Sequence, residues 1–113
     1  DGCVVTTPER HDQMIAFTSQ VPHALACAYV LSPQCPGHAG FSAGSYRDVS
    51  RVANINEALW TELFLSNAGP LAEELDILIG NLSRIRDAVQ AGDGGRLSSL
   101  LREGRLVKES LGE

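Results

Sequence analysis

The spacing of apolar residues along this chain indicates helices throughout. Near the N-terminus, apolar residues recur at steps of three and four and so share one helical stripe: Met14, Phe17, Val21, Leu25 and Ala28. Thr7 and Pro8 suit a helix start, because Thr can cap a helix and Pro loses no hydrogen bond in the first turn. The pattern predicts a helix over 8–31. Pro22 lies inside it and removes the hydrogen bond to the Thr18 carbonyl, so we expect a bend there.

The second half of the chain carries the strongest helical pattern. From Gly69 onward, apolar residues recur at alternating steps of four and three: Leu71, Leu75, Leu78, Leu82, Ile85 and Val89. Ile77 and Ile79 widen this apolar surface, so we expect a long helix that is buried on two sides. A Gly-rich turn at 92–95 ends the pattern, and Asp93 is placed to cap a last helix.

The segment between these two patterns is less regular. Residues 32–45 are rich in Pro, Gly and Ser and show no periodicity, which predicts a functional or mobile loop. A short helix is predicted over 47–53, and the next one begins at either Asn54 or Asn56. No alternating strand pattern occurs. The sequence therefore predicts an all-α fold in a single domain, 1–113, with about five to six helices, a kinked first helix and one long buried helix.

A small helical chain cannot cover both sides of such an apolar helix by itself. Pairing with a second copy would bury the remaining side, and a twofold dimer is the commonest arrangement of this kind. The alternative is a monomeric bundle with the long helix at its centre. We expect the homodimer.

Composition narrows the class of protein. The 113 residues are 43% hydrophobic and 20% charged, as in ordinary soluble globular domains. A formal net charge of −5 argues against a nucleic-acid-binding protein, whose surface would be basic, and requires a local basic site for any anionic ligand. No apolar run is long enough to span a membrane, and the N-terminus does not look like a signal peptide. We therefore expect neither a nucleic-acid nor a membrane partner.

The cysteines bear on the compartment. There are three, an odd number without paired spacing, which fits a reducing cytoplasm better than a disulfide framework. A Cys3–Cys35 bridge is the alternative. We expect a cytoplasmic protein. The chain begins at Asp1 without an initiator Met, which favours a fragment of a longer protein.

Polar residues gather first on the N-terminal helix. Ser19, Gln20 and His23 lie within one turn of each other and away from the apolar stripe, beside the carbonyl that Pro22 leaves free. We expect a polar notch there, in which His23 is either a ligand-binding residue or a satisfied helical histidine. His23 and Cys27 are spaced to share a metal, but no further ligand has suitable spacing, so we expect no metal site.

Polar residues gather again around the helix over 47–53. Arg47 and Arg51 lie one turn apart, and Gly44 supplies a backbone N–H just before the helix. Amide groups, a helix N-terminus and guanidinium groups together suit a carboxylate. Arg47 is better explained by pairing with Asp48 or another surface acid. For Arg51, a carboxylate site and a surface ion pair are equally good explanations.

The remaining candidates have structural explanations. We expect His11 to be half buried, His38 to be exposed in the loop and Trp60 to lie in the core.

There is no Gly-rich nucleotide-binding motif and no strand–helix unit to carry one. The chain by itself is therefore not expected to be an active oxidoreductase.

Several motifs follow one another in a recognisable order: Thr7-Pro8-Glu9, His11-Asp12, Ser19-x-x-Pro22-His23, Gly44-x-Tyr46-Arg47-Asp48-x-Ser50-Arg51-Val52-Ala53, Leu59-Trp60, Leu63-Phe64-Leu65 and Asn67. Over 6–90, this ordered set resembles the C-terminal domain of the prephenate and arogenate dehydrogenase family. The resemblance implies a helical, dimer-forming domain that holds substrate against an N-terminal Rossmann domain. It further implies an enzyme of tyrosine biosynthesis that oxidatively decarboxylates its substrate, with NAD or NADP bound by the other domain.

The resemblance also implies roles for individual residues. Arg51 resembles the arginine that grips a substrate carboxylate, His23 the histidine at the substrate pocket, and Gly44 a glycine whose backbone approaches the substrate. Trp60 matches a tryptophan that reaches the partner subunit's pocket, and His11 matches the first residue of a His-Asp pair. The predicted substrate-binding residues are Arg51, His23, Gly44, Trp60, His11, Gln20 and Ser19. The catalytic serine and general-base histidine are implied to lie in the other domain, so none is expected in this chain.

Two positions depart from the family pattern. Gln20 stands where many members have a histidine, and a neutral amide supplies no positive charge. One hypothesis is a shift in preference from prephenate toward arogenate. Asn56-Glu57 replaces the usual Asp-Pro before the helix of Trp60, which changes the cap and leaves the helix. The alternative to the enzyme is a non-catalytic homodimerisation or ligand-sensing module.

Overall fold

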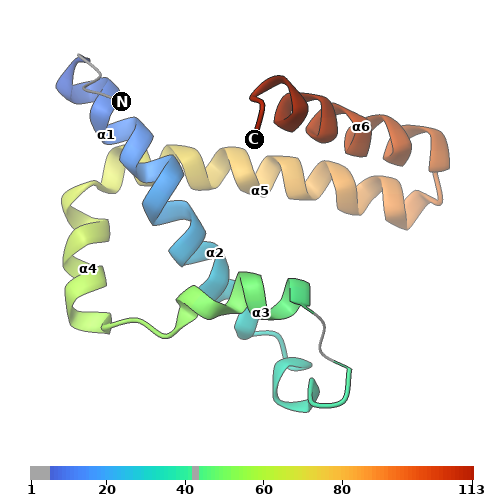
Figure 1. The fold of residues 1–113 in the computed structure, drawn as a ribbon, viewed down its shortest axis with the longest axis horizontal. Helices are drawn as coiled ribbons and strands as arrows, with labels where there is room; N and C mark the ends of the chain where they lie inside the picture. The colour runs from blue at the N-terminus through green and yellow to red at the C-terminus, as the bar shows by residue number, and fades with distance from the viewer. Residues whose placement is uncertain (1–5, 42–43) are drawn as a thin grey trace. The chain divides into compact units, whose positions relative to one another are not determined.

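The computed structural model describes residues 6–41 and 44–113, and this part of the chain consists of helices joined by turns and one longer loop, with no strand (Figure 1). The predicted all-α fold is confirmed. Two compact units can be distinguished, Asp1–Leu75 and Asp76–Glu113. The boundary falls inside the long helix α5 (Ala68–Ala91), so one domain over 1–113 stays a prediction.

The first helix is a continuous rod made of three pieces (Figure 1), namely α1 (Pro8–Ile15), a π-helical turn η1 (Ala16–Gln20) and α2 (Val21–Val30). Thr7 caps the rod, since its hydroxyl oxygen accepts a hydrogen bond from the Arg10 amide at 3.1 Å. The helix predicted over 8–31 is therefore present.

The disturbance expected near Pro22 takes the form of the π-helical turn just before it. The Val21 amide donates to the carbonyl of Ala16, five residues back, in place of the usual four. The ring of Pro22 would collide with the carbonyl four residues before it in a regular helix, and Pro has no N–H for that carbonyl. Widening the helix by one residue relieves the collision, which accounts for the position of the turn.

The rest of the first unit packs on this rod. The loop contains a 3-10 turn, η2 (Cys35–Gly37), and is followed by α3 (Gly44–Ser50) and a second 3-10 turn, η3 (Arg51–Ala53). Both α3 and η3 contact α2. The short helix predicted over 47–53 therefore begins earlier than expected, at Gly44.

Helix α4 (Glu57–Ser66) settles the choice between the two asparagines. Asn56 is its N-cap, and the side-chain oxygen accepts a hydrogen bond from the Leu59 amide at 3.0 Å. Asn54 lies outside the helix. The start at Asn56 is confirmed and the start at Asn54 is wrong.

The second unit is a helical hairpin formed by the C-terminal part of α5 and α6 (Gly94–Ser110), which run antiparallel (Figure 1). Gly92 turns the chain with a φ of 65°, a value that glycine adopts without strain. Asp93 caps α6 by accepting from the Arg96 amide at 3.0 Å. The long helix, the glycine turn and the Asp93 cap are all as predicted.

Few side chains are buried within one chain. The buried apolar residues of the described part are Ala16, Val21, Ala26, Leu71 and Ala88. On α5, four large apolar side chains are half exposed or more: Ile77 at 55%, Ile79 at 58%, Leu82 at 50% and Val89 at 59%. A single chain therefore does not bury this helix on two sides. None of the described helices combines the length and the apolar character needed to cross a membrane.

Candidate functional site

His23 and Trp60 form a stacked pair. Their ring centroids lie 3.9 Å apart and the ring planes are inclined by 20°. His23 comes from the first turn of α2, and Trp60 comes from the first turn of α4, which the Asn56 cap fixes. Phe64, one turn along α4, meets the indole edge-on at 5.8 Å and 75°. Trp60 is half buried, so it lies at the edge of the core.

The imidazole of His23 is also held along one edge. Its Nδ1 lies 2.8 Å from the backbone carbonyl oxygen of Ser19. A carbonyl oxygen only accepts hydrogen bonds, so this contact is a hydrogen bond when Nδ1 carries the proton. In the neutral ring, Nε2 then bears the lone pair. Ser19 therefore contacts His23 through its backbone carbonyl and not through its side chain. The spacing of the two residues in the sequence did not indicate this.

Gln20 is buried, with 5% of its surface exposed, and its amide is bonded at both ends. The nitrogen donates to the Leu63 carbonyl at 3.1 Å, and the oxygen accepts from the Asn67 side chain at 2.9 Å. Within the polar notch predicted at Ser19, Gln20 and His23, the Gln20 side chain is not open, because the end of α4 covers it. The sequence pattern could not reveal this contact, since the partners lie more than forty residues away.

Arg47 and Arg51 lie on α3 and η3, and both side chains are exposed. In the described part of the chain, neither guanidinium takes part in an ion pair. The surface ion pair expected for Arg47 is therefore wrong for the residues described. Gly44 is the first residue of α3 and does not precede it. Cys27 on α2 contacts the Ala53 carbonyl at 3.9 Å, which fastens the turn that carries Arg51 to the helix that carries His23.

His11 lies apart from these groups. It is exposed, and its Nδ1 is 3.7 Å from a carboxylate oxygen of Asp12, so the expected half-buried position is wrong. Among the described residues, no hydrogen bond, ion pair or ring contact joins His11 or Arg51 to the His23–Trp60 pair. The structure therefore brings His23, Trp60 and Ser19 into direct contact and leaves Arg51, Gly44 and His11 as separate exposed groups.

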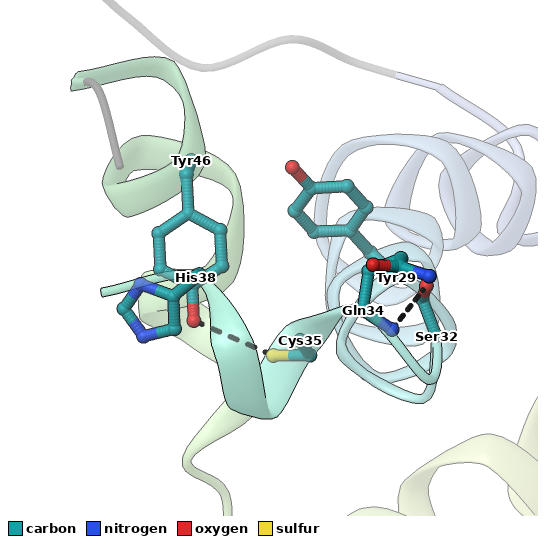
Figure 2. A pocket seen from close by; sticks show the side chains of 6 residues that line it. All are labelled: Tyr29, Ser32, Gln34, Cys35, His38 and Tyr46. Carbon is teal, nitrogen blue, oxygen red and sulfur yellow. Dashed lines mark hydrogen bonds between the residues drawn. The ribbon is translucent and has the colours of Figure 1, made fainter. Parts of the chain in front are cut away.

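A second cluster was not foreseen (Figure 2). His38 stacks on Tyr46 with centroids 4.4 Å apart, and the Cys35 thiol lies 3.6 Å from the Tyr46 hydroxyl. With Tyr29, these side chains line a small open cavity of about 140 Å³. His38 is half buried, so the expected exposure is wrong. Nothing in the aperiodic sequence of the loop indicated which of its residues would meet α3.

Two details of this cluster concern its chemistry. The hydrogen bond with Cys35 and, to a smaller extent, desolvation raise the pKa of Tyr46 above its ordinary value. Cys27 and Cys35 are both free thiols. Cys3 lies outside the described residues, so the Cys3–Cys35 alternative stays untested. Within residues 6–41 and 44–113, no group of three or more His, Cys, Asp or Glu side chains could hold a metal ion.

Comparison with known proteins identifies the family. Residues 7–103 match the model of the prephenate dehydrogenase dimerization domain. The chain belongs to this family. The resemblance seen in the order of its motifs is thereby confirmed.

Relatives from bacteria cover most of the chain. It is 34% identical over 111 residues to the cyclohexadienyl dehydrogenase of Zymomonas mobilis, spanning 91% of this chain and 37% of that protein. It is 26% identical over 113 residues to the prephenate dehydrogenase of Bacillus subtilis, spanning 96% of this chain and 30% of that protein. The chain thus spans about a third of the length of these relatives.

A solved structure shares the fold of this dimerization domain. The crystal structure of Synechocystis arogenate dehydrogenase superimposes with a TM-score of 0.84 at 21% sequence identity. The match covers 96% of this chain and 41% of that one. The likeness establishes the helical architecture independently of the sequence match.

Proposed function

We propose that this chain is the substrate-binding and dimerisation domain of a prephenate or arogenate dehydrogenase, an oxidoreductase of tyrosine biosynthesis. The family match over 7–103 carries the proposal. His23 and Trp60, two residues predicted to bind substrate, come from different helices and stack within one chain, which supports a site at this place. The reach of Trp60 into the partner subunit's pocket stays a prediction. The substrate would be a small dicarboxylate.

In this proposal, each side chain binds a different part of the substrate. Arg51 offers an exposed guanidinium for a substrate carboxylate, and a planar fork suits that group. His23 supplies a hydrogen bond from the edge of its ring, and Trp60 supplies a flat apolar surface. Gly44 and His11 complete the predicted substrate contacts from exposed positions.

Gln20 and Ser19 have a different place in the proposal. The Ser19 carbonyl contacts Nδ1 of His23, and the buried Gln20 side chain connects the π-helical turn to the end of α4 by a hydrogen bond. Direct contact of either side chain with substrate stays a prediction. So does the shift from prephenate toward arogenate, which a comparison of the two substrates in Gln20→His would test.

The described residues do not fit a dinucleotide. They contain no strand, and hence no strand–helix unit whose Gly-rich turn could receive a pyrophosphate. In this proposal, NAD or NADP is bound by an N-terminal Rossmann domain of the complete enzyme, which also supplies the catalytic groups. This chain alone would bind substrate without turning it over.

We further infer that the partner of this chain is a second copy. The half-exposed Ile79, Leu82 and Val89 lie on one side of α5 and give it an apolar surface that one chain leaves open. A homodimer would cover it, in keeping with the family's dimerization domain. We also propose a cytoplasmic location, which the odd number of cysteines without paired spacing favours.

The test uses the complete protein that contains this chain. Prephenate and arogenate are each supplied with NAD and with NADP, and formation of the reduced nucleotide is followed. Arg51→Ala should lower kcat/KM roughly 10- to 100-fold, the loss expected for a charge-assisted hydrogen bond. Arg47→Ala, an exposed arginine one turn away, is the matched control. If no combination is turned over by a correctly folded dimer, the non-catalytic dimerisation or sensing module is the better conclusion.

A further inference from the structure

We propose that the Ser19 carbonyl and the Trp60 indole hold His23 in one tautomer, with the proton on Nδ1, so that Nε2 is the nitrogen His23 presents to a ligand. Ser19 and Trp60 are then positioning residues. The inference deepens the proposed function and rests on it, because it specifies which atom of His23 meets the substrate.

The first constraint is the hydrogen bond along the ring edge. Nδ1 of His23 is 2.8 Å from the Ser19 oxygen, a distance that needs a proton between the two atoms. A neutral imidazole has a single N–H, and the bond made by one nitrogen decides the state of the other. The acceptor is a backbone carbonyl one helical turn away, so rotation of the Ser19 side chain cannot remove it.

The second constraint acts on the face of the ring. The indole of Trp60 covers the imidazole at 3.9 Å, nearly parallel to it at 20°. Phe64 in turn contacts the indole edge-on, and the Asn56 cap fixes the turn of α4 that carries Trp60. A half-turn of the imidazole about its Cβ–Cγ bond would replace Nδ1 by a carbon beside the Ser19 oxygen. The stack holds the plane of the ring, and the hydrogen bond selects one of the two orientations that this plane allows.

The two constraints leave one polar atom for a ligand. In an imidazole ring, Nε2 lies on the far side from Cβ, beyond the reach of the carbonyl that Nδ1 contacts. In the neutral ring, Nε2 accepts a hydrogen bond from a donor such as a hydroxyl group. In the protonated ring, it donates one to a carboxylate. Either way, the contact is made by Nε2.

The first experiment reads the tautomer directly and needs no ligand. Long-range proton–nitrogen NMR correlations are recorded on the nitrogen-15-labelled 113-residue chain at a pH where His23 is neutral. We expect the proton on Nδ1, and a shift to a mixture of tautomers in Trp60→Leu. Tyr29→Phe, at the other end of α2, is the control and should leave His23 unchanged. A proton on Nε2 in the unsubstituted chain would overturn the proposal.

Trp60→Leu also requires a folded protein, which the helical circular dichroism spectrum reports. If this variant unfolds, Trp60→Phe keeps an aromatic face of smaller area and takes its place. A Trp60→Phe chain with an unaltered tautomer then still supports stacking by an aromatic ring. A folded Trp60→Leu chain with the proton entirely on Nδ1 would remove Trp60 from the proposal.

The second experiment separates the two ring nitrogens by their isosteres. The amide nitrogen of Asn reaches the place of Nδ1, and that of Gln reaches the place of Nε2. In the complete enzyme, His23→Gln should keep KM within a few fold, whereas His23→Asn should raise it roughly tenfold, the loss of one ligand hydrogen bond. The opposite order would overturn the proposal. If Arg51→Ala, His23→Gln and His23→Asn all leave KM and kcat/KM unchanged, the proposed substrate site is wrong. The tautomer is then tested by the NMR experiment alone.

Discussion

The side-chain amides of Gln20 and Asn67 meet at 2.9 Å, with the nitrogen of Asn67 donating to the oxygen of Gln20. The same Asn67 nitrogen donates to the Asp12 carbonyl at 3.0 Å, and Gln20 donates onward to the Leu63 carbonyl at 3.1 Å. Both backbone acceptors fix the direction of the amides, since a carbonyl cannot donate. This chain of hydrogen bonds joins α1, the π-helical turn and the end of α4.

The first prediction concerns this chain of bonds. Gln20→Leu removes both bonds of the buried amide. The Leu63 carbonyl then keeps the Ser66 hydroxyl as a donor, and the Asn67 amide nitrogen keeps the Asp12 carbonyl as its acceptor. The free energy of unfolding in urea should fall by about 1–3 kcal/mol. Gln90→Leu, the same exchange at an exposed position of α5, is the control. Equal stability of the two variants would show that the buried amide contributes nothing.

The second prediction concerns the cap of α4. Asn56→Ala should cost about 0.5–2 kcal/mol, because the amide of Leu59 loses its acceptor. Asn54→Ala, an exposed asparagine two residues earlier, should cost much less. Chemical denaturation of both variants measures the difference. Since Trp60 is in the first turn of α4, Asn56→Ala should also weaken the stack on His23, visible as a change in the fluorescence of this chain's single Trp.

The third prediction concerns the close packing of α2. Ala26 is fully buried, with 0% of its surface exposed. A leucine there has no space, so Ala26→Leu should lower the free energy of unfolding by about 1–3 kcal/mol. Ala28→Leu places the same side chain at an exposed position of the same helix and should be nearly neutral. A stable Ala26→Leu chain would mean that the surroundings of Ala26 are not closely packed.

The fourth prediction follows from the raised pKa of Tyr46. Its neutral hydroxyl bonds to Cys35, so the folded state holds the proton to higher pH than the unfolded state does. This contribution to stability is complete below the ordinary pKa of tyrosine and is lost as the pH rises through the raised value. Tyrosinate absorbance on alkaline titration should show Tyr46 ionising late, and Cys35→Ala should bring its pKa down. An unchanged titration in Cys35→Ala would exclude Cys35 as the cause.

The fifth prediction tests the second copy on α5. Ile79→Glu places a charge on a side chain that is 58% exposed in one chain and would be covered in the dimer. Light scattering should show the dimer dissociating, with helical content preserved. Asn81→Glu adds the same charge on a different side of the helix and should leave more of the dimer intact. A monomeric unsubstituted chain would contradict the homodimer directly.

Local chemistry allowed much of the fold to be predicted. The caps at Thr7 and Asp93 could be located because each is a contact between residues three apart. The irregularity near Pro22 could be predicted for the same reason, because the missing N–H of a proline removes a hydrogen bond from its own helix. The long helix followed from the period of its apolar residues.

Contacts between distant segments could not be predicted in this way. The burial of Gln20 depends on Leu63 and Asn67, which no local pattern connects to it. The stack of His38 on Tyr46 depends on the path of an aperiodic loop. His23 and Trp60 were each singled out from the sequence, but their contact arises only where α2 and α4 meet.

The π-helical turn at Ala16–Gln20 has one more consequence, for comparisons between this rod and others. Each residue of an α-helix advances the direction of its side chains by about 100°. The wider π-helical turn absorbs one extra residue, so the side chains after it keep the directions that they would have in a regular rod one residue shorter. Aligning this chain with a relative that has no such turn requires a one-residue gap there. Without the gap, either the residues before the turn or His23 after it would be matched to the wrong neighbours.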